Sequence, residues 1–268
     1  KVKIFRLPVH SKNPILIFIN TILISLIVIF FRINIVHARS RAPAWACFLS
    51  CVITRAKFVT TFHGIYNFSN SIKKFYNSVM VRSNLIIAGS NYVFDHIHNN
   101  YGKLIDTKKR LLVIFRGINT EYFDNSNITD KKVKNLYDTI NLNPEKFKIL
   151  LPGRLTRWKG QEMFIESLNL LKTKYNKENF QAIILGSHQG RKVYFKKLVS
   201  MVEQYRLNKD VFFLQHFKEM PVAYYVSDVV VSSSIEPEAF GRVSVEAQSM
   251  RRVILASDHG GSKETIID

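Results

Sequence analysis

The sequence Leu151-Pro-Gly-Arg-Leu-Thr-Arg-Trp-Lys-Gly160 lies between an apolar run that is typical of a strand and a segment with helical spacing. Gly153 permits a tight turn after the strand, and Gly160 opens the helix. Arg154 and Lys159 therefore fall in a loop at the edge of a sheet, where two cations and a helix N-terminus could hold a diphosphate. A strand–helix loop with two solvated cations fits the same pattern equally well.

A second segment of the same kind is Ser232-Ser-Ser-Ile-Glu-Pro-Glu-Ala-Phe-Gly-Arg-Val-Ser-Val-Glu246. Glu238 lies in its loop, and Glu246 lies about one and a half turns into the helix that follows. A carboxylate there can accept both hydrogens of a ribose diol, because it offers two acceptor oxygens. An amphipathic helix with two surface acids is the alternative. The helix N-terminus, which suits an anionic ligand, is formed by the backbone N–H groups of Phe240, Gly241 and Arg242.

Apolar runs alternate with helical patterns on both sides of these segments. The predicted strands are Ile35–Ala38, Phe58–Phe62, Leu85–Ala88, Leu111–Phe115, Lys148–Leu151, Ala182–Leu185, Val211–Leu214, Val229–Ser232 and Val253–Ala256. The predicted helices are Ser71–Arg82, Asn91–Tyr101, Gly160–Tyr175, Lys192–Tyr205, Met220–Val226 and Gly241–Met250. This alternation predicts an α/β protein with parallel sheets covered on both faces.

The polar stretch around residues 125–147, with one short helix, is typical of an interdomain linker. It divides the chain into a Rossmann-like lobe over residues 1–124 and a second one over residues 125–268. Such sheets bind ligands at the carboxyl ends of their strands, so the ligand is expected in the cleft between the lobes.

An uncharged, isoleucine-rich stretch covers residues 15–31. It is nearly long enough to span a bilayer, but Asn20, Thr21 and Ser25 interrupt it, and it leads directly into the predicted strand Ile35–Ala38. These features favour a buried helix over a membrane-inserted segment. Partial insertion into a bilayer surface stays open.

The net charge of +19 is concentrated in the first half, where residues 1–150 contain 22 Lys and Arg against 7 Asp and Glu. This indicates an anionic partner, although part of the charge could be a solvated face. The usual nucleic-acid-binding motifs are absent from the sequence, so no nucleic acid partner is expected. Cys47 and Cys51 suggest neither a disulfide framework nor a zinc site, which fits a reducing, cytoplasmic compartment.

The two quoted segments, in this order, resemble the retaining GT-B glycosyltransferases of family 4, and in particular the proteobacterial subset assigned to lipopolysaccharide or capsule assembly. The resemblance covers most of the chain. In the first half it rests on Ile35-Val-His-Ala-Arg-Ser-Arg-Ala-Pro-Ala-Trp45, Thr60-Thr-Phe-His-Gly-Ile-Tyr66, Ala88-Gly-Ser-Asn91 and Phe115-Arg-Gly-Ile-Asn119. In the second half it includes Ala256-Ser-Asp-His-Gly-Gly-Ser-Lys-Glu264.

The resemblance implies that Arg154 and Lys159 bind the diphosphate of a nucleotide-sugar donor and stabilise its charge as the glycosidic bond breaks. It implies that Glu246 holds the donor ribose, that Glu238 contacts the sugar near the reacting carbon, and that His63 reaches the sugar or phosphate from the first lobe. The donor-binding positions also include Gly153, Gly186, Phe240, Gly241 and Arg242.

By the same resemblance, the reaction retains the anomeric configuration through front-face attack, with the leaving phosphate as base. Neither a metal nor a further cofactor is expected. The acceptor is expected to be a glycan or a lipid-linked molecule, and the location cytoplasmic, with peripheral contact to an anionic inner membrane as an option.

Compared with the family, both ends look truncated: its opening strand and Gly-rich loop would precede Lys1, and its closing helices would follow Asp268. Arg251 and Val253 stand where the family usually has Gly and then Pro, although a Gly commonly ends such a helix in a left-handed conformation. Two alternatives therefore remain: an inactive fragment that at most binds nucleotide, and a basic membrane- or nucleic-acid-binding module.

Overall fold

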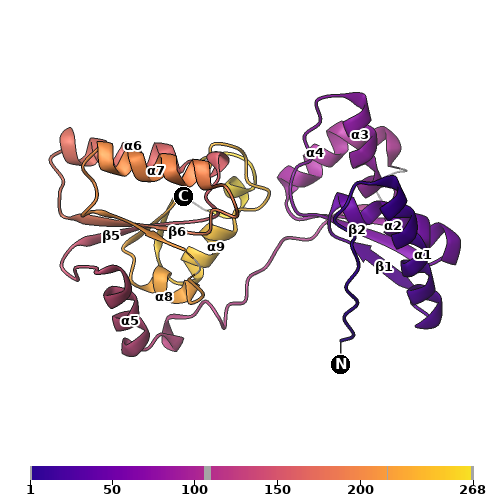
Figure 1. Ribbon diagram of the computed structural model, residues 1–268, viewed down its shortest axis with the longest axis horizontal. Helices are drawn as coiled ribbons and strands as arrows, with labels where there is room; N and C mark the ends of the chain where they lie inside the picture. Colours follow the sequence, from indigo (N-terminus) through magenta and orange to yellow (C-terminus); the bar gives the residue numbers. More distant parts are fainter. Residues whose placement is uncertain (1, 106–109, 216, 267–268) are drawn as a thin grey trace. The chain divides into compact units, whose positions relative to one another are not determined.

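A computed structural model of the protein describes residues 2–105, 110–215 and 217–266 (Figure 1). The chain forms two compact units, Lys1–Arg116 and Gly117–Asp268. Each unit contains one parallel sheet, as the alternation of apolar runs and helical patterns predicts. The division lies a few residues before the boundary at 124/125 expected from the sequence.

The first unit contains a four-stranded sheet in the order β1-β2-β3-β4. The strands are Ile35–Ala38, Lys57–Phe62, Leu85–Ala88 and Leu111–Val113. The helices are α1 (Pro14–Phe30), α2 (Arg41–Thr54), α3 (Ser71–Asn77) and α4 (Asn91–Tyr101). Because all four strands run parallel, the residues that follow β1, β2, β3 and β4 meet at one edge of the sheet.

Helix α1 corrects one expectation. Residues 15–31 do form a helix, but the prediction that its apolar side chains are buried is wrong. The exposed side chains of α1 are Ile15, Phe18, Ile19, Ile22, Leu23, Leu26, Ile29 and Phe30. A helix able to span a bilayer is not found in the described part of the chain.

The polar residues of α1 are buried, and one of them, Ser25, contacts α2. Thr21 and Ser25 are buried and donate their hydroxyl hydrogens to the carbonyls one turn earlier, at 2.9 and 2.8 Å. Ser25 Oγ also donates to Ser50 Oγ of α2 at 3.1 Å, and Asn20 Nδ2 donates to the Leu16 carbonyl at 2.8 Å. Small, locally satisfied polar groups let the two helices approach closely, so the apolar side chains are left on the outside.

The second unit contains a five-stranded sheet in the order β7-β6-β5-β8-β9. In chain order its elements are α5 (Asp130–Ile140), β5 (Phe147–Pro152), α6 (Gln161–Thr173), β6 (Phe180–Leu185), α7 (Lys192–Gln204), β7 (Val211–Leu214), α8 (Met220–Tyr225), β8 (Val229–Ser232), α9 (Arg242–Ser249) and β9 (Val253–Ala256). Helices α6 and α7 cover one face of the sheet, and α5, α8 and α9 lie on the other (Figure 1).

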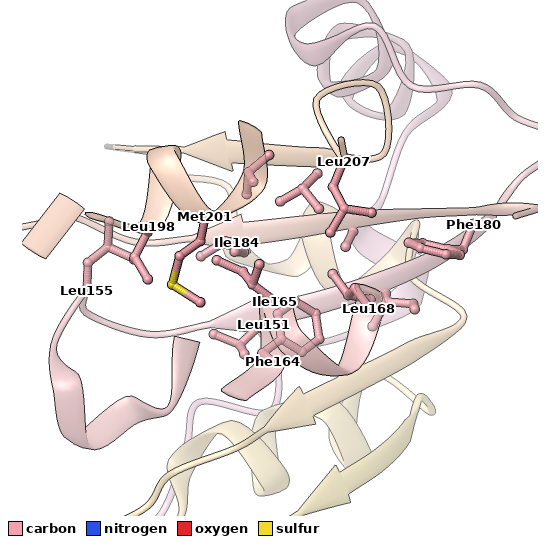
Figure 2. Packing of buried hydrophobic residues seen from close by; sticks show 14 residues of the cluster. Leu151, Leu155, Phe164, Ile165, Leu168, Phe180, Ile184, Leu198, Met201 and Leu207 are labelled. Atoms are coloured by element: carbon pink, nitrogen blue, oxygen red, sulfur yellow. The ribbon is translucent and has the colours of Figure 1, made fainter. Parts of the chain in front are cut away.

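Each face of this sheet has its own apolar core. On the α6 and α7 side, Phe164, Ile165 and Leu168 of α6 pack with Leu198 and Met201 of α7 over the strands (Figure 2). The other core contains Leu136, Leu150, Ile183, Val222, Tyr224 and Ala247, together with further residues of α5, α8 and α9. Burial on both faces explains why β5 and β6 are mainly apolar in sequence.

Three details differ from the expected elements. The predicted helix over residues 71–82 is α3 followed by a 3-10 turn at Ser78–Val81, and the predicted strand over residues 111–115 ends at Val113. Helix α2 was not among the predicted helices. The short helix expected in the linker is α5, and it packs into the second core through the fully buried Leu136.

Candidate donor-binding site

The order of strands in the second unit locates a ligand site. β5 lies between β6 and β8, and the chain leaves β5 toward β6 and later returns on the other side to form β8. Open α/β sheets bind ligands at such a reversal, at the carboxyl ends of the two strands. The segments that follow β5 and β8 are residues 153–160 and 233–241, which are the two segments that the sequence singles out.

These two loops touch through backbone that requires glycine. Gly160 has φ +70°, and a Cβ there would lie 1.9 Å from the carbonyl oxygen of Ser233. The Ser233 hydroxyl donates to the carbonyl oxygens of Lys159 and Gly160 at 3.2 Å each. A Cβ on Gly186, after β6, would lie 1.9 Å from the carbonyl oxygen of Gly153. Glycine at these positions therefore fixes how closely the loops after β5, β6 and β8 pack.

Lys159 and Glu238 meet across the two loops. Lys159 Nζ forms an ion pair with Glu238 Oε1, and the same oxygen accepts a hydrogen bond from the Ser234 hydroxyl. The two charged side chains are 16% and 20% exposed, so the pair is mostly shielded from water but still reachable. A cation and a carboxylate thus lie together at the carboxyl ends of β5 and β8.

Glu246 is held by two donors. Its carboxylate is 7% exposed. Tyr224 Oη donates to Oε2 at 2.8 Å, and Arg242 Nη2 donates to Oε1 at 2.7 Å. Burial and the neighbouring carboxylate raise the pKa of Tyr224 well above its usual value, so its hydroxyl stays a donor. Each carboxylate oxygen can accept more than one hydrogen bond, so both could still bind a ribose hydroxyl.

The start of α9 has the predicted form. Gly241 caps the helix with φ +87°, and Phe240 before it is 6% exposed. The loop is braced by a neighbouring glycine pair, since the Gly261 N–H donates to the Glu238 carbonyl at 2.7 Å. A Cβ on Gly260 would lie 2.7 Å from that same carbonyl oxygen. The backbone of Glu238 is therefore held in place by its contacts with Gly260 and Gly261.

Arg154 occupies a more open position than Lys159. It is exposed, and its guanidinium lies 5.6 Å from the centroid of the Trp158 ring. The Arg154 carbonyl accepts from Gln161 Nε2 at 3.0 Å, which ties the loop to the first turn of α6. The structure thus places Arg154 and Lys159 on the same loop, with Lys159 in contact with the predicted carboxylate.

His63 belongs to the first unit, and it follows β2. Its Nε2 accepts a hydrogen bond from Arg39 Nε at 2.7 Å. Burial, followed by the charges of Arg116 and Arg39 and by His37, lowers the pKa of His63 to about 4, so the imidazole is neutral at pH 7. The charged side chains that act on His63 within this unit are thus the two arginines.

Two functional candidates give no signal in the sequence. Tyr224 stands next to another tyrosine in a predicted helix, and only the fold shows which of the two reaches Glu246. Ser234 is one of three consecutive serines, and its contact with Glu238 likewise needs the fold. In the described residues, no group of three His, Cys, Asp or Glu side chains could hold a metal ion. Metal-independent action stays a prediction.

Comparisons with known proteins identify the family of both units. The family described as "Glycosyltransferase Family 4" matches residues 1–122, and the family described as "Glycosyl transferases group 1" matches residues 133–268. Each match covers about one of the two structural units.

Solved structures show the same fold. A glycosyltransferase from Rickettsia africae ESF-5 is 36% identical, with a TM-score of 0.85 over 98% of this chain and 68% of that one. Anabaena Alr3699/HepE, solved in complex with UDP and glucose, has a TM-score of 0.81 at 20% identity, and the match covers 97% of this chain and 68% of that one. At that identity the second likeness shows the fold alone.

Curated relatives are more distant. A lipopolysaccharide 1,2-N-acetylglucosaminetransferase of Salmonella typhimurium is 27% identical over 50% of this chain and 36% of its own length. A D-inositol 3-phosphate glycosyltransferase of Paenarthrobacter aurescens is 28% identical over 68% of this chain and 43% of its own length. The matches thus span less than half of these relatives. The family matches and the two parallel-sheet units together show that the chain belongs to the family 4, group 1 glycosyltransferases of the GT-B fold.

Proposed function

We propose that this chain transfers a sugar from a nucleoside diphosphate sugar to a glycan or lipid-linked acceptor in cell-envelope synthesis, with retention of configuration. The observation that carries the proposal is the ion pair of Lys159 and Glu238 at the strand reversal of the second unit. Helix α9 begins just after Glu238 and carries the buried Glu246. In support, Anabaena Alr3699/HepE, which has the same fold, is solved with UDP and glucose and with UDP-glucose, and one curated relative is a lipopolysaccharide 1,2-N-acetylglucosaminetransferase.

Each group has a chemical role in this proposal. Lys159 and the more exposed Arg154 neutralise the diphosphate as it leaves, which is the electrostatic contribution that is often largest in such reactions. Glu246 accepts hydrogen bonds from the ribose hydroxyls, and Tyr224 and Arg242 hold it in place. Glu238 lies beside Lys159 and contacts the sugar. His63, neutral at pH 7, contributes a hydrogen bond from the first unit rather than a charge.

Calorimetric titration with UDP and GDP tests the donor site. We expect one nucleotide to bind, and Glu246→Ala to weaken it by about tenfold or more, because a hydrogen-bonded carboxylate is removed. Glu166→Ala is the matched control, since Glu166 is an exposed acid on α6. If neither nucleotide binds, or if both variants bind equally well, the proposed donor site is wrong. Binding without turnover, in a chain given nucleotide sugar and acceptor, would favour the inactive-fragment alternative.

We also propose that the first unit contacts an anionic membrane, as a peripheral protein at the cytoplasmic face. The exposed side chains of α1, together with Val52 and Ile53 of α2, define an apolar surface, and α1 and α2 pack against each other. The first Asp or Glu of the sequence is Asp95, and the residues before it include 12 Lys and Arg. An apolar surface on such a cationic unit fits a bilayer with anionic lipids.

Vesicle co-sedimentation tests this contact. We expect binding to vesicles that contain phosphatidylglycerol, weak binding to pure phosphatidylcholine, and loss of binding in the double variant Phe18→Ser, Leu26→Ser. Ile72→Ser is the control, because Ile72 is an exposed apolar residue of α3 outside this surface. Equal binding by the double variant, or a concentration-dependent dimer that disappears in it, would contradict the membrane assignment.

A further inference from the structure

Two consecutive serines after β8 hold the two halves of the Lys159–Glu238 ion pair. Ser233 binds the backbone of one half, because its hydroxyl lies 3.2 Å from the carbonyl oxygens of Lys159 and Gly160. Ser234 binds the side chain of the other half, because its hydroxyl donates to Glu238 Oε1 at 2.5 Å. Ser234 is only 2% exposed, so water has little access to its hydroxyl and cannot readily replace it.

Both contacts of the Glu238 carboxylate use the same oxygen. Oε1 accepts from Lys159 Nζ and from the Ser234 hydroxyl, and the described residues offer no hydrogen-bond partner to Oε2. The Glu238 side chain is 20% exposed, and its Oε2 is not a buried atom without a partner, so Oε2 is the oxygen that a ligand can reach. The protein thus holds one oxygen of this carboxylate and leaves the other for a ligand.

Lys159 cannot neutralise the carboxylate and a diphosphate equally well. Its stem lies over Gly153, where a Cβ would be 3.6 Å from Lys159 Cδ, and its ammonium ends on Glu238. A diphosphate carries more negative charge than a carboxylate, so we expect it to draw the ammonium away. Glu238 then loses its cation while it is still mostly shielded from water, which costs free energy unless another donor remains. Within the described part of the chain, Ser234 is the one other side chain that donates to Glu238.

We propose that Ser234 is a positioning residue, which holds Glu238 in place while Lys159 moves from this carboxylate to the donor diphosphate. The ion pair of the ligand-free chain then neutralises both charges until the donor arrives. This inference rests on the proposed function, in which Lys159 binds the diphosphate and Glu238 contacts the sugar. Ser234 acts through Glu238 and needs no contact of its own with the donor.

Calorimetric titration of the full chain with UDP, GDP and inorganic pyrophosphate tests this exchange of partners. We expect Ser234→Ala to weaken binding about fivefold, because the carboxylate that Lys159 leaves then has no remaining donor. Glu238→Gln should strengthen binding about fivefold, because Lys159 no longer has to leave a charged partner. These opposite signs distinguish the exchange from damage to the loop, which would weaken binding in both variants.

Two double variants show whether the effects pass through the proposed partners. In the Glu238→Gln background, Ser234→Ala should change the affinity by less than about twofold, because a neutral amide depends less on a hydrogen-bond donor than a carboxylate does. In the Lys159→Gln background, Glu238→Gln should no longer strengthen binding. A Ser234→Ala effect that persists in the first background would show a merely structural role and overturn the inference. A Glu238→Gln gain that persists in the second would show plain repulsion between the carboxylate and the phosphates, and would overturn it as well.

Ser167→Ala is the matched control. Ser167 is an exposed serine of α6, and its hydroxyl donates to the Met163 carbonyl of its own helix at 2.8 Å. This variant should bind UDP, GDP and pyrophosphate as the unsubstituted chain does, and a thermal melt of each variant verifies that it folds.

Pyrophosphate separates this inference from the proposed function. If pyrophosphate binding responds to the variants as expected while neither nucleotide binds, the exchange is supported and the proposed donor is wrong. If a nucleotide binds equally well to the unsubstituted chain, to Ser234→Ala and to Glu238→Gln, the nucleotide site stands and the inference is overturned. If neither pyrophosphate nor a nucleotide binds, both are wrong.

Discussion

The hydroxyl of Tyr224 offers a sharp test of how Glu246 is positioned. Tyr224 is fully buried, and its hydroxyl donates to a carboxylate that is itself 7% exposed. Tyr224→Phe removes this one donor and keeps the ring, so no cavity is created. A hydrogen bond to a charged group contributes about 1.5–3 kcal/mol, and we expect the second unit to lose about 2 kcal/mol of its free energy of unfolding. For a unit of this size, that corresponds to a melting temperature lower by about 4–8 °C.

The same variant should weaken UDP binding. Without the Tyr224 hydroxyl, Glu246 keeps Arg242 as a partner but gains rotamer freedom, which costs about 1 kcal/mol to remove on binding, or about fivefold in affinity. Denaturant unfolding and calorimetry measure the two effects. Tyr225→Phe is the control: Tyr225 is 37% exposed, and its ring contact with Arg252, at 5.2 Å from the centroid, survives in phenylalanine. Equal changes in both variants, or an unchanged UDP affinity in Tyr224→Phe, would refute the positioning role.

Three further outcomes follow from the geometry. Gly186→Ala should lower the free energy of unfolding by more than about 3 kcal/mol and abolish nucleotide binding, because a Cβ would lie 1.9 Å from the Gly153 carbonyl oxygen. Gly190→Ala is the control: Gly190 has φ +83° but open space around it, so denaturant unfolding should show a loss of only about 1–2 kcal/mol. Arg251→Gly should raise the free energy of unfolding by about 0.5–1 kcal/mol, since Arg251 has φ +53° and relief of its strain exceeds the added chain entropy. The pKa of His63 is lowered from 6.5 to about 4, so between these pH values the unfolded chain binds a proton that the folded chain does not. The first unit should therefore lose stability as the pH falls from about 6.5 to 4. In a series of thermal melts, His63→Gln should show a flatter dependence of stability on pH.

The order of elements could be predicted from the sequence because the central strands β5 and β6 of the second unit are largely buried and therefore mainly apolar. The direction in which α1 faces could not be predicted. A helix with apolar residues all around it indicates burial, but Thr21 and Ser25 satisfy their hydroxyls within α1, and Ser25 also contacts Ser50 of α2. The apolar side was then left outside. The hydrophobicity of α1 does not reveal its orientation, because the orientation depends on which face of the helix packs more closely on α2.

The turn after α9 is left-handed, although an arginine and not a glycine stands there. Arg251 stands where a glycine would be usual, and the sequence therefore puts that turn in doubt. In the structure, Arg251 adopts φ +53° and the Arg251 N–H donates to the Gln248 carbonyl at 2.9 Å, so the helix still ends there. The buried Met250 before it and the strand β9 after it hold the turn, at a cost of about 1–2 kcal/mol.

The candidate site of the second unit is easier to recognise in the sequence than any site of the first unit, and the reason is physical. Where two backbones approach closely, as at Gly160 and Ser233, only glycine fits, so the contact leaves a fixed residue type at a fixed place. Exposed residues at the strand ends of the first unit, such as Arg39, are under no such constraint, because an exposed loop tolerates many side chains. Glycines therefore mark in the sequence where the loops of the second unit meet, while the ligands of the first unit must be identified from side chains that the fold itself does not require.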